Sequence, residues 1–438
     1  MKNELLKKIR DRTIVAGVVG LGYVGLPLAV EKAKAGFKTI GFDIQKKKVE
    51  MVNAGHNYIG DVVDSDLAKL VENGMLSATT EYDFVEKVDF IAICVPTPLD
   101  RHQEPDISYV RNSAVEISKH LQIGTIVVLE STTYPGTTEE LLKPILEKGS
   151  GLICGKDFYL GFSPERVDPG NLIYNTKNTP KVVGAIGCDA AEVISAMYSV
   201  VLDGQVHIVS SPAVAEMEKI LENMYRNINI GLVNELGRLC HEMGISVWEV
   251  IDAAKTKPYG FQPFYPGPGL GGHCIPLDPY YLTWKAREYG FHTTLIENSM
   301  TINDSQPKYC VERAMRILNR NKQAMNGSKI LMLGISYKND IDDYRESPAI
   351  RVYKELKKAG AEVNYFDPWV AEFKMTYGES GKSIQELTPE IVKKYDLIII
   401  TTAHHNVDYA MVQTNAKAIF DTKNVMKNIM PRENIEVL

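Results

Sequence analysis

VVGLGYVGLPLAVEKAKAG, residues 18–36, decides the fold of this chain of 438 residues. An apolar run leads into Gly20, Gly22 and Gly25, spaced as GxGxxG, and an amphipathic pattern of helical period follows. Asp43 stands at the end of the next apolar run. GxGxxG alone is weak, but a strand, a glycine loop, a helix and a second strand ending in an acidic residue together predict a dinucleotide-binding Rossmann domain.

Each part of this motif has a physical task. Gly20 permits a tight turn, Gly22 lets a pyrophosphate approach the backbone, and Gly25 brings the helix close to the strand, so that its N-terminus faces the phosphates. Asp43 is expected to bind the adenosine ribose and to repel a 2′-phosphate, which favours NAD over NADP, although three lysines at 46–48 weaken this preference. A flavin site or a cofactor-free turn is the poorer alternative.

The same alternation of strands and helices occurs twice. From residue 13 to about 138 the apolar runs are TIVAGVVG, FKTIGFD, VDFIAICVP and GTIVVLES, and from residue 329 onward they are KILMLGI, AEVNYFD, YDLIIITT and AKAIFDT. Such runs, separated by amphipathic stretches, indicate parallel sheets covered by helices. Asp367 ends the second run of the later region, as Asp43 does in the earlier one. We therefore predict an α/β protein with two Rossmann-like parallel-sheet domains.

Thr97 and Thr132 follow two strands of the first domain. Because ligands of open α/β sheets bind at the carboxyl ends of the strands, both are candidate contacts on the nicotinamide side. Ordinary turn chemistry explains them equally well. The predicted cofactor contacts are Gly20, Gly22, Tyr23, Val24, Gly25, Asp43, Lys48, Thr97 and Thr132.

A single long helix is expected between the domains, over residues 211–244. Its apolar residues occur almost all round, which is typical of a helix buried on every side, so we expect it to join the two halves and to pack against its copy in a homodimer. Lys219, Asn223 and Asn227 share one face. Because unpaired buried polar groups are costly, they require partners. A catalytic role and a polar seam satisfied by the dimer partner both remain open.

Cys274 lies in a loop of glycine, proline and aromatic residues that spans 257–279. Long loops of such composition are usually functional. Cys274 follows two glycines, where backbone amides can converge, whereas Cys94 lies in an apolar strand as a structural cysteine does. Asp278 is four residues further on, within reach if the segment turns helically. Cys274 is therefore the candidate nucleophile.

Composition excludes several classes of protein. With 45% hydrophobic and 24% charged residues and a net charge of −6, the chain is an ordinary globular protein without the basic balance of a nucleic-acid binder. No apolar stretch is long enough for a membrane span and no signal peptide begins the chain, so we expect a cytoplasmic protein. Its six scattered cysteines predict no disulfide framework.

The chain resembles the UDP-glucose/GDP-mannose dehydrogenase family over essentially its whole length. The motifs that carry this resemblance, in order, are GLGYVGLP, CVPTP, ESTTYPGTT, SPERVDPG, EKILENMYRNINIGLVNE, PGPGLGGHCIPLDP and LGISYKNDIDDYRES. It implies two successive NAD-dependent oxidations at C6 of a nucleotide sugar, from alcohol to carboxylate. The implied domains are 1–205 for NAD, 206–315 for dimerisation and the cysteine loop, and 316–438 for the UDP-sugar.

By this resemblance Cys274 captures the aldehyde as a thiohemiacetal, which the second oxidation converts to a thioester. Lys219 and Asn223 match positions that hold the developing oxyanion and the reactive oxygen. Asp278 matches the carboxylate associated with proton transfer and water activation.

Further roles follow from the same match. Glu165 matches a glutamate that assists thioester hydrolysis, Thr132 a threonine that orients water and cofactor, and Lys338 and Arg345 positions that grip the nucleotide. The expected substrate contacts are Glu165, Arg166, Lys219, Asn223, Phe264, Gly271, Lys338 and Arg345.

One departure bears on the sugar. UDP-glucose dehydrogenases have phenylalanine after Ser-Pro-Glu and a second glutamate four residues after the first, but Arg166 and Pro169 stand here. SPERVDPG, KPYGFQPFYPGPG and YYLTWKAREYG look most like the enzymes that act on UDP-N-acetylglucosamine, serving a surface polysaccharide or glycan. UDP-glucose and UDP-N-acetylmannosamine are the alternatives.

Three other functions compete with this interpretation of the sequence. A zinc enzyme could use His273, His404 or His405, but their spacing fits no known site, so no metal is expected and His404 and His405 are placed on the surface or in a substrate loop. A non-catalytic Rossmann protein is disfavoured by the joint presence of the candidate catalytic residues. An ordinary two-electron alcohol dehydrogenase would not need Cys274.

Overall fold

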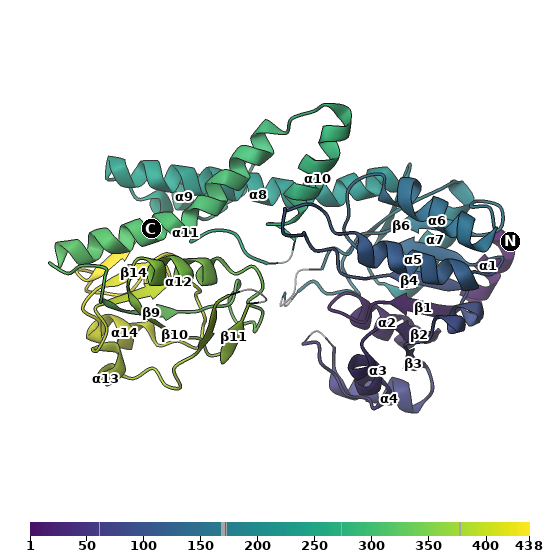
Figure 1. The fold of residues 1–438 in the computed structure, drawn as a ribbon, viewed down its shortest axis with the longest axis horizontal. Coiled ribbons are helices and arrows are strands. Elements are labelled where there is room, and N and C mark those ends of the chain that lie inside the picture. Colours follow the sequence, from purple (N-terminus) through teal and green to yellow (C-terminus); the bar gives the residue numbers. More distant parts are fainter. Residues whose placement is uncertain (61, 168–170, 172, 273, 376–377) are drawn as a thin grey trace. The chain divides into compact units, whose positions relative to one another are not determined.

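The computed structural model describes residues 1–60, 62–167, 171, 173–272, 274–375 and 378–438. The chain forms two compact units, each described here by itself. The first comprises Met1–Glu222 and Tyr280–Phe291, and the second comprises Asn223–Pro279 and His292–Leu438. Figure 1 follows their elements along the chain from purple to yellow.

The first unit contains an eight-stranded sheet in the order β3-β2-β1-β4-β5-β6-β7-β8. Strands β1 to β6 are parallel, but β7 is antiparallel to β6 and parallel to β8. The described residues between β6 and β7 form no helix, and neighbouring strands without a crossover helix run antiparallel. The strands are β1 (Val15–Val19), β2 (Lys38–Phe42), β3 (Leu76–Thr79), β4 (Phe90–Ile93), β5 (Ile126–Leu129), β6 (Tyr159–Phe162), β7 (Lys181–Ala185) and β8 (Val206–Val209).

Helices cover both faces of this sheet because its strands are apolar on both sides. Phe90 and Ala92 of β4 pack into one core with α2 and α7, while Ile91 and Ile93 pack into a second core with α5 and α6. The helical segments are α1 (Lys2–Arg10), α2 (Gly25–Lys34), α3 (Lys46–Asn53), α4 (Asp64–Glu72), η1 (Tyr82–Lys87), α5 (Ser108–His120), η2 (Thr137–Leu142), α6 (Lys143–Ser150) and α7 (Cys188–Val201). Later in the chain, η3 (Arg287–Tyr289) and the part of α10 (Asp278–Ala286) from Tyr280 onward also belong to this unit.

The second unit contains a five-stranded parallel sheet in the order β10-β9-β13-β14-β15. Ile330 and Met332 of β9 face α11 and α12, and Leu331 and Leu333 face α13 and α14. The elements are α9 (Val247–Ala254), α11 (Thr294–Arg320), β9 (Lys329–Leu333), α12 (Pro348–Lys358), β10 (Glu362–Phe366), β11 (Glu372–Lys374), β12 (Ser380–Lys382), α13 (Pro389–Val392), β13 (Leu397–Ile400), α14 (Tyr409–Asn415), β14 (Ile419–Asp421) and β15 (Ile435–Val437).

Both sheets have a switch point, where the chain leaves one strand toward one edge and returns on its other side. It lies between β1 and β4 in the first sheet and between β9 and β13 in the second. Ligands of open α/β sheets bind outside the carboxyl ends of the strands at such points. The loops after β1, β4, β9 and β13 are therefore where ligand contacts are expected.

Helix α8 spans Pro212–Met243, a length of 32 residues, and the chain passes through it from the first unit to the second. The prediction of two Rossmann-like domains joined by a long central helix is confirmed. Burial on every side is not found within one chain, because one series of its apolar side chains is exposed. These are Val214, Met217, Leu221, Tyr225, Leu232, Leu236, Leu239 and Met243. The boundaries near residues 205 and 315 stay a prediction.

In the part of the chain that the structure describes, no helix combines the length and apolar composition of a membrane span.

Candidate active site

The loop after β1 fits the pyrophosphate of a dinucleotide. Gly20 has a φ of +91°, a conformation that favours glycine, and a Cβ atom on Gly25 would lie 1.8 Å from the carbonyl oxygen of Gly20. A Cβ atom on Gly22 would meet no atom of the described residues within 4 Å. The turn, the bare backbone and the close helix packing that the cofactor requires are thus all present.

Asp43 is tied to this loop. Its Oδ2 accepts a hydrogen bond from the backbone N–H of Leu21 at 2.9 Å, and its Oδ1 accepts one from Gln45 at 2.8 Å. Lys48 places its Nζ 3.6 Å from Oδ2, so it contacts the carboxylate expected at the ribose. Tyr23 is 44% exposed, and Val24 precedes the first turn of α2.

The loops after β4 and β5 are joined by a hydrogen bond between the two predicted threonines. The Thr97 hydroxyl donates to the backbone carbonyl of Thr132 at 2.8 Å. The hydroxyl of Tyr281, a residue that is 1% exposed, donates to the carbonyl of Thr97. Thr97 and Thr132 therefore lie together at the carboxyl edge of the first sheet.

Glu165 follows β6, and both of its carboxylate oxygens have neighbours that bear N–H groups. Oε1 accepts the backbone N–H groups of Arg166 at 2.8 Å and Val167 at 3.0 Å, while Oε2 lies 3.5 Å from the Nζ of Lys181. Lys219 of α8 donates from Nζ to the backbone carbonyl of Glu165 at 2.6 Å. The first unit thus brings Glu165 and Lys219 together.

Arg166, an expected substrate contact, is bound to α8. It donates from Nε to Glu222 at 3.1 Å, and its guanidinium lies 3.5 Å from Glu218. Burial and the neighbouring Glu222 raise the pKa of Glu218 to about 7. The sequence prediction missed both glutamates, although their four-residue spacing on one helix face was the available signal.

In the second unit, Cys274 lies one helical turn before Asp278. The carbonyl of Cys274 accepts the backbone N–H groups of Leu277 at 3.0 Å and Asp278 at 2.9 Å, and α10 begins at Asp278. Asn223 donates from Nδ2 to Oδ2 of Asp278, and both side chains are buried. Cys274 is half-buried. The second unit thus connects two expected catalytic residues through a hydrogen bond.

Asn227 finds its partners within the same chain. Its Nδ2 donates to the carbonyl of Ile275 at 3.2 Å, and its Oδ1 accepts the hydroxyl of Ser299 of α11 at 2.7 Å. Asn303 of α11 donates to the carbonyl of Asn227 at 3.0 Å. This polar seam therefore needs no dimer partner, and it holds the residue that follows Cys274.

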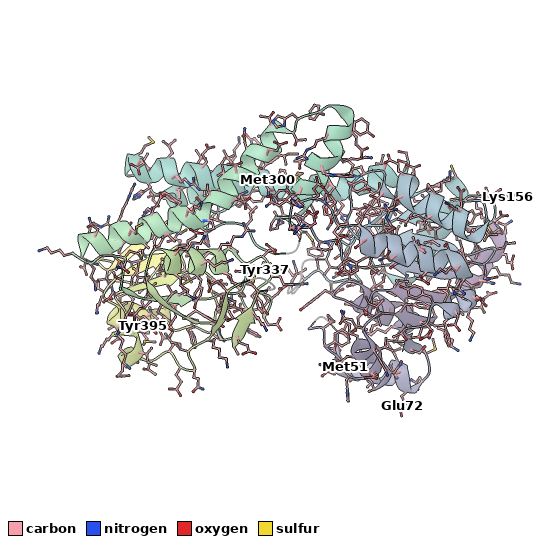
Figure 2. The ribbon with its side chains drawn as sticks, in the orientation of Figure 1. Met51, Glu72, Lys156, Met300, Tyr337 and Tyr395 are labelled. Atoms are coloured by element: carbon pink, nitrogen blue, oxygen red, sulfur yellow. The ribbon has the colours of Figure 1, made fainter. Side chains whose placement is uncertain are left out.

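The glycine-rich part of the cysteine loop packs against the loop after β9. A Cβ atom on Gly271 would lie 2.6 Å from Cβ of Tyr337 and 2.7 Å from Cδ of Pro348. Figure 2 labels Tyr337, which immediately precedes Lys338. Phe264, an expected substrate contact, packs edge-to-face on Tyr225 with ring centres 5.6 Å apart.

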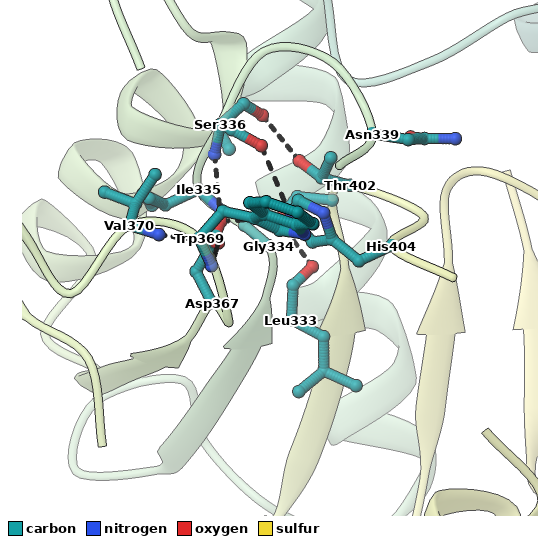
Figure 3. A network of polar contacts seen from close by, with 12 residues as sticks. Leu333, Gly334, Ile335, Ser336, Asn339, Asp367, Trp369, Val370, Thr402 and His404 are labelled. Atoms are coloured by element: carbon teal, nitrogen blue, oxygen red, sulfur yellow. Dashed lines mark hydrogen bonds and ion pairs between the residues drawn. The ribbon is translucent and has the colours of Figure 1, made fainter. Parts of the chain in front are cut away.

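A buried network fixes the strand ends of the second sheet (Figure 3). Asp367 at the end of β10 accepts the backbone N–H groups of Ile335 at 2.6 Å and Ser336 at 3.1 Å. His404 follows β13, and its Nε2 lies 3.1 Å from the same carboxylate oxygen. The surface placement was wrong for His404, which is 0% exposed, because the hydrogen bonds to Asp367 and Asp340 hold it inside. The side chain of His405 is 84% exposed.

Lys338 and Arg345 both belong to the loop after β9. The carbonyl of Lys338 accepts the hydroxyl of Ser336 at 2.8 Å, and its side chain is half-buried. Arg345 makes a two-pronged contact with Asp343, at 2.9 Å from Nε and 2.7 Å from Nη2. Both cations therefore lie in a loop at the switch point of the second sheet.

The described residues contain no group of three or more metal-ligating side chains. His273 and Pro169 lie outside the described residues.

Known proteins match this chain over nearly its whole length. Three models of the UDP-glucose/GDP-mannose dehydrogenase family match, namely the NAD-binding domain at residues 14–202, the central domain at 213–305 and the UDP-binding domain at 331–428. UDP-N-acetyl-D-glucosamine 6-dehydrogenase of Pseudomonas aeruginosa is 37% identical over 90% of this chain and 91% of its own. UDP-N-acetyl-D-mannosamine dehydrogenase of Methanocaldococcus jannaschii is 32% identical over 96% of this chain and 95% of its own.

The solved structure of a UDP-D-ManNAc dehydrogenase from Pyrococcus horikoshii has the same fold, with a TM-score of 0.88 and 30% identity over 97% of this chain and 99% of that one. The predictions of NAD as cofactor and of a UDP-sugar oxidoreductase are confirmed by these matches. The chain therefore belongs to the UDP-glucose/GDP-mannose dehydrogenase family and is an NAD-dependent UDP-sugar dehydrogenase.

Proposed function

We propose that this dehydrogenase oxidises C6 of UDP-N-acetylglucosamine to a carboxylate through a thioester on Cys274. The observation that carries the proposal is the arrangement of Cys274, Asp278 and Asn223. The backbone of Cys274 and Asp278 forms one helical turn, and Asn223 binds the carboxylate of Asp278. A nucleophile with a carboxylate and an amide donor held in its own fold unit is what covalent capture of an aldehyde requires.

NAD, held by Gly20, Gly22, Gly25 and Asp43, would supply a hydride acceptor for each of the two oxidations. The sulfur of Cys274 bonds to the carbon of the aldehyde from the first oxidation, and the carbonyl oxygen takes up negative charge. Lys219 and Asn223 supply the N–H donors that stabilise such an oxyanion. Loss of a second hydride from that carbon leaves the thioester.

Hydrolysis then releases the acid. A water oxygen bonds to the thioester carbon while Glu165 accepts one of its protons, and Thr132 orients the water. The carbon–sulfur bond breaks with its electrons on sulfur, so the carboxylic acid and the Cys274 thiolate are the products. Asp278 serves proton transfer at the thiol.

Lys338 and Arg345 are the proposed nucleotide contacts, because cations beside a switch point suit a diphosphate. Arg166, Phe264 and Gly271 complete the proposed sugar site, Arg166 through its hold on α8 and Gly271 through its packing on Tyr337.

The choice of sugar rests on sequence. SPERVDPG and the aromatic segment before Cys274 resemble enzymes of UDP-N-acetylglucosamine, and the relative from Pseudomonas aeruginosa carries that name. UDP-N-acetylmannosamine is the second candidate, favoured by the name of the Methanocaldococcus jannaschii relative. A UDP-linked uronic acid is an activated donor, so we propose that glycosyl transfer into a surface polysaccharide or glycan consumes the product.

We also propose a homodimer through α8. Leu232, Leu236 and Leu239 are between 39% and 54% exposed and recur at helical spacing on that helix. Apolar stripes of this kind are typical of helix–helix interfaces.

NADH formed per sugar consumed tests the proposed function. Wild type and Cys274→Ala are compared with UDP-N-acetylglucosamine, UDP-N-acetylmannosamine and UDP-glucose, each run to completion. About two NADH per UDP-N-acetylglucosamine, with loss of net turnover in the variant, is expected for covalent catalysis. One NADH per sugar, unaffected by the substitution, would refute the thioester. Faster turnover of another sugar would refute the substrate.

A further inference from the structure

Three ionisable side chains form a buried chain at the carboxyl edge of the first sheet. Lys181, the first residue of β7, places Nζ 2.7 Å from Oε2 of Glu130 and 3.5 Å from Oε2 of Glu165. The side chains of Lys181, Glu130 and Glu165 are 5%, 0% and 16% exposed. Glu130 directly follows β5, and Glu165 lies three residues beyond the end of β6 at Phe162. One ammonium group therefore links the ends of two strands that carry proposed catalytic residues.

The charges of Lys181, Glu130 and Glu165 compensate one another. Burial alone would lower the pKa of Lys181, but Glu130 and Glu165 outweigh it and raise that pKa above its ordinary value. Lys181 is thus a cation at every working pH. Glu130 also accepts the hydroxyl of Tyr198. Removal of one member of such a buried group leaves another charge without compensation, which is strongly unfavourable.

The two oxygens of Glu165 differ in their surroundings. Oε1 accepts two backbone N–H groups of its own loop, from Arg166 and Val167. Oε2 faces a side chain from a different strand, Lys181. The loop's own backbone thus binds Oε1, whereas Oε2 lies beside a cation from another strand.

We infer that Lys181, itself held by Glu130, is a positioning residue that orients the carboxylate of Glu165 for thioester hydrolysis. This inference rests on the proposed function, in which Glu165 accepts a proton from the attacking water. Lys181 touches neither substrate nor cofactor in this assignment. Its effect should therefore appear in hydrolysis alone and not in the two oxidations that precede it.

A second buried lysine supplies a matched control. Lys32 of α2 is 0% exposed, and its Nζ lies 4.8 Å from the ring centre of Tyr198 and 4.2 Å from that of Phe90. Its Nζ makes no hydrogen bond to any of the described residues. Lys181 also lies over the ring of Tyr198, at 5.1 Å, so the two lysines share a neighbour. Of the two, Lys181 alone has a described contact with Glu165.

The test is a single-turnover experiment on the full chain with NAD and UDP-N-acetylglucosamine. It compares wild type with Lys181→Met, Lys181→Arg, Lys32→Met and Glu165→Gln. NADH absorbance follows the oxidations, and the intact mass of the quenched protein follows the acyl adduct on Cys274. Lys181→Gln is included as a second uncharged variant, in case the methionine variant does not fold.

The expected result is a split between the two readouts. Glu165→Gln should slow decay of the adduct by about 100-fold, as loss of a general base does, and Lys181→Met by roughly tenfold or more. Formation of NADH by Lys181→Met should stay within about twofold of wild type, since Lys181 has no assigned part in the two oxidations. Lys181→Arg should restore most of the hydrolysis rate, and Lys32→Met should hydrolyse the adduct as wild type does.

The outcomes distinguish failure of the inference about Lys181 from failure of the thioester mechanism. If Glu165→Gln accumulates the adduct while Lys181→Met and Lys181→Gln hydrolyse it at the wild-type rate, the inference about Lys181 is overturned. Equal slowing by Lys32→Met would also overturn it, because the effect would then be general to the buried core. If no variant, including Glu165→Gln, ever carries an adduct, the thioester mechanism itself fails.

Discussion

His404 and Asp367 are hydrogen-bonded at 3.1 Å with both side chains shielded from solvent. The Nδ1 of His404 accepts the backbone N–H of Asp340 at 3.0 Å, so the imidazole proton resides on Nε2, facing Asp367. The ring thus connects three segments, namely the residues that follow β10, those that follow β13 and the loop after β9. That loop carries Lys338 and Arg345, the proposed nucleotide contacts.

His404→Ala should loosen the loop over residues 335–346. The substitution removes one of the donors to Asp367 and leaves the Asp340 N–H without its acceptor, at a cost of about 1–3 kcal/mol. Hydrogen exchange of peptides from this loop should accelerate, and the affinity for UDP should fall. His405→Ala, at the exposed neighbour, should change stability by less than about 0.5 kcal/mol. Equal effects of the two substitutions would contradict this view.

Acid should weaken the same network. Burial would raise the pKa of Asp367, but the hydrogen bonds from His404 and from the backbone outweigh it and lower that pKa. A lowered carboxyl pKa gives stability that is complete above the ordinary value and is lost as pH falls through the lowered one. Protection of the loop in wild type should therefore decline below about pH 4. In Asp367→Asn, protection should be weak already at pH 7 and should lose this acid dependence.

Gly22→Ala and Gly25→Ala should fail in different ways. A methyl group on Gly22 meets no described atom within 4 Å, so Tm should hold while NAD affinity falls, because the pyrophosphate can no longer reach the backbone. A methyl group on Gly25 would lie 1.8 Å from the carbonyl of Gly20, so the fold itself should suffer. NAD titration together with a melting curve distinguishes them. A large fall in Tm for Gly22→Ala would contradict the role assigned to that residue.

Asn227→Ala should reduce turnover more than it reduces NAD binding. The substitution removes the donor to the carbonyl of Ile275 and one of the two acceptors of the Ser299 hydroxyl, at about 1–3 kcal/mol for the buried groups. Alkylation of Cys274 by iodoacetamide, followed by peptide mass analysis, should change in rate as its loop loosens. Asn229→Ala on the same helix is the control, since among the described residues the Asn229 side chain bonds only locally, to the carbonyl of Tyr225. An unchanged Cys274 alkylation rate in Asn227→Ala would count against this role.

Glu218 and Glu222 should respond to pH with opposite signs. Glu218 has a pKa raised to about 7, so its contribution to stability is complete below its ordinary pKa and is lost as pH rises through 7. Glu218→Gln should thus gain roughly 1–3 kcal/mol over wild type as pH rises from 5 to 9. Despite burial, the hydrogen bond from Arg166 lowers the pKa of Glu222, so Glu222→Gln should destabilise at pH 7 and less below pH 4. Urea unfolding across pH checks both signs, and parallel curves for the two variants would refute the assignment.

Leu232→Glu with Leu239→Glu should abolish the proposed dimer. Both leucines are about half exposed on α8, at 50% and 54%, and a buried unpaired carboxylate at an interface is costly. Sedimentation or light scattering should shift from the mass of a dimer to 48.9 kDa. Glu235→Gln on the same helix should leave the mass unchanged. A wild type that sediments as a monomer would rule out the proposed dimer.

Much of the fold could be predicted because its signals are local. Four of the strands are apolar runs, each followed by a glycine or an aspartate. These residues are Gly20, Asp43, Gly334 and Asp367. Helix α8 was expected over 211–244 and spans Pro212–Met243. The strands β6 to β8 and the antiparallel pairing of β7 with β6 were not predicted, because Tyr159–Phe162 is four residues long and carries no periodicity of its own.

The candidate site, too, could be predicted only in part from the sequence. Cys274 could be singled out because two glycines precede it in its loop, and Glu165 through the resemblance of its motif to the family. The side chains that support the site could not be predicted, because they are distant in sequence from the residues they bind. Ser299 lies 72 residues from Asn227, and Lys181 contacts Glu130 across 51 residues. Contacts of that kind are set by tertiary packing, which leaves no periodic trace in the chain.

The packing of Gly271 against Tyr337 and Pro348 also bears on how this enzyme could evolve. Gly272 has a φ of +88° and a Cβ there would lie 3.0 Å from the Tyr337 ring, so neither glycine can acquire a side chain without displacing the loop. Substitution of either glycine is therefore unfavourable, whether it arises in evolution or in the laboratory. A library intended to widen the range of accepted sugars should leave this segment intact and vary the exposed aromatic residues Tyr259, Phe261 and Tyr265, where substitution meets far less resistance.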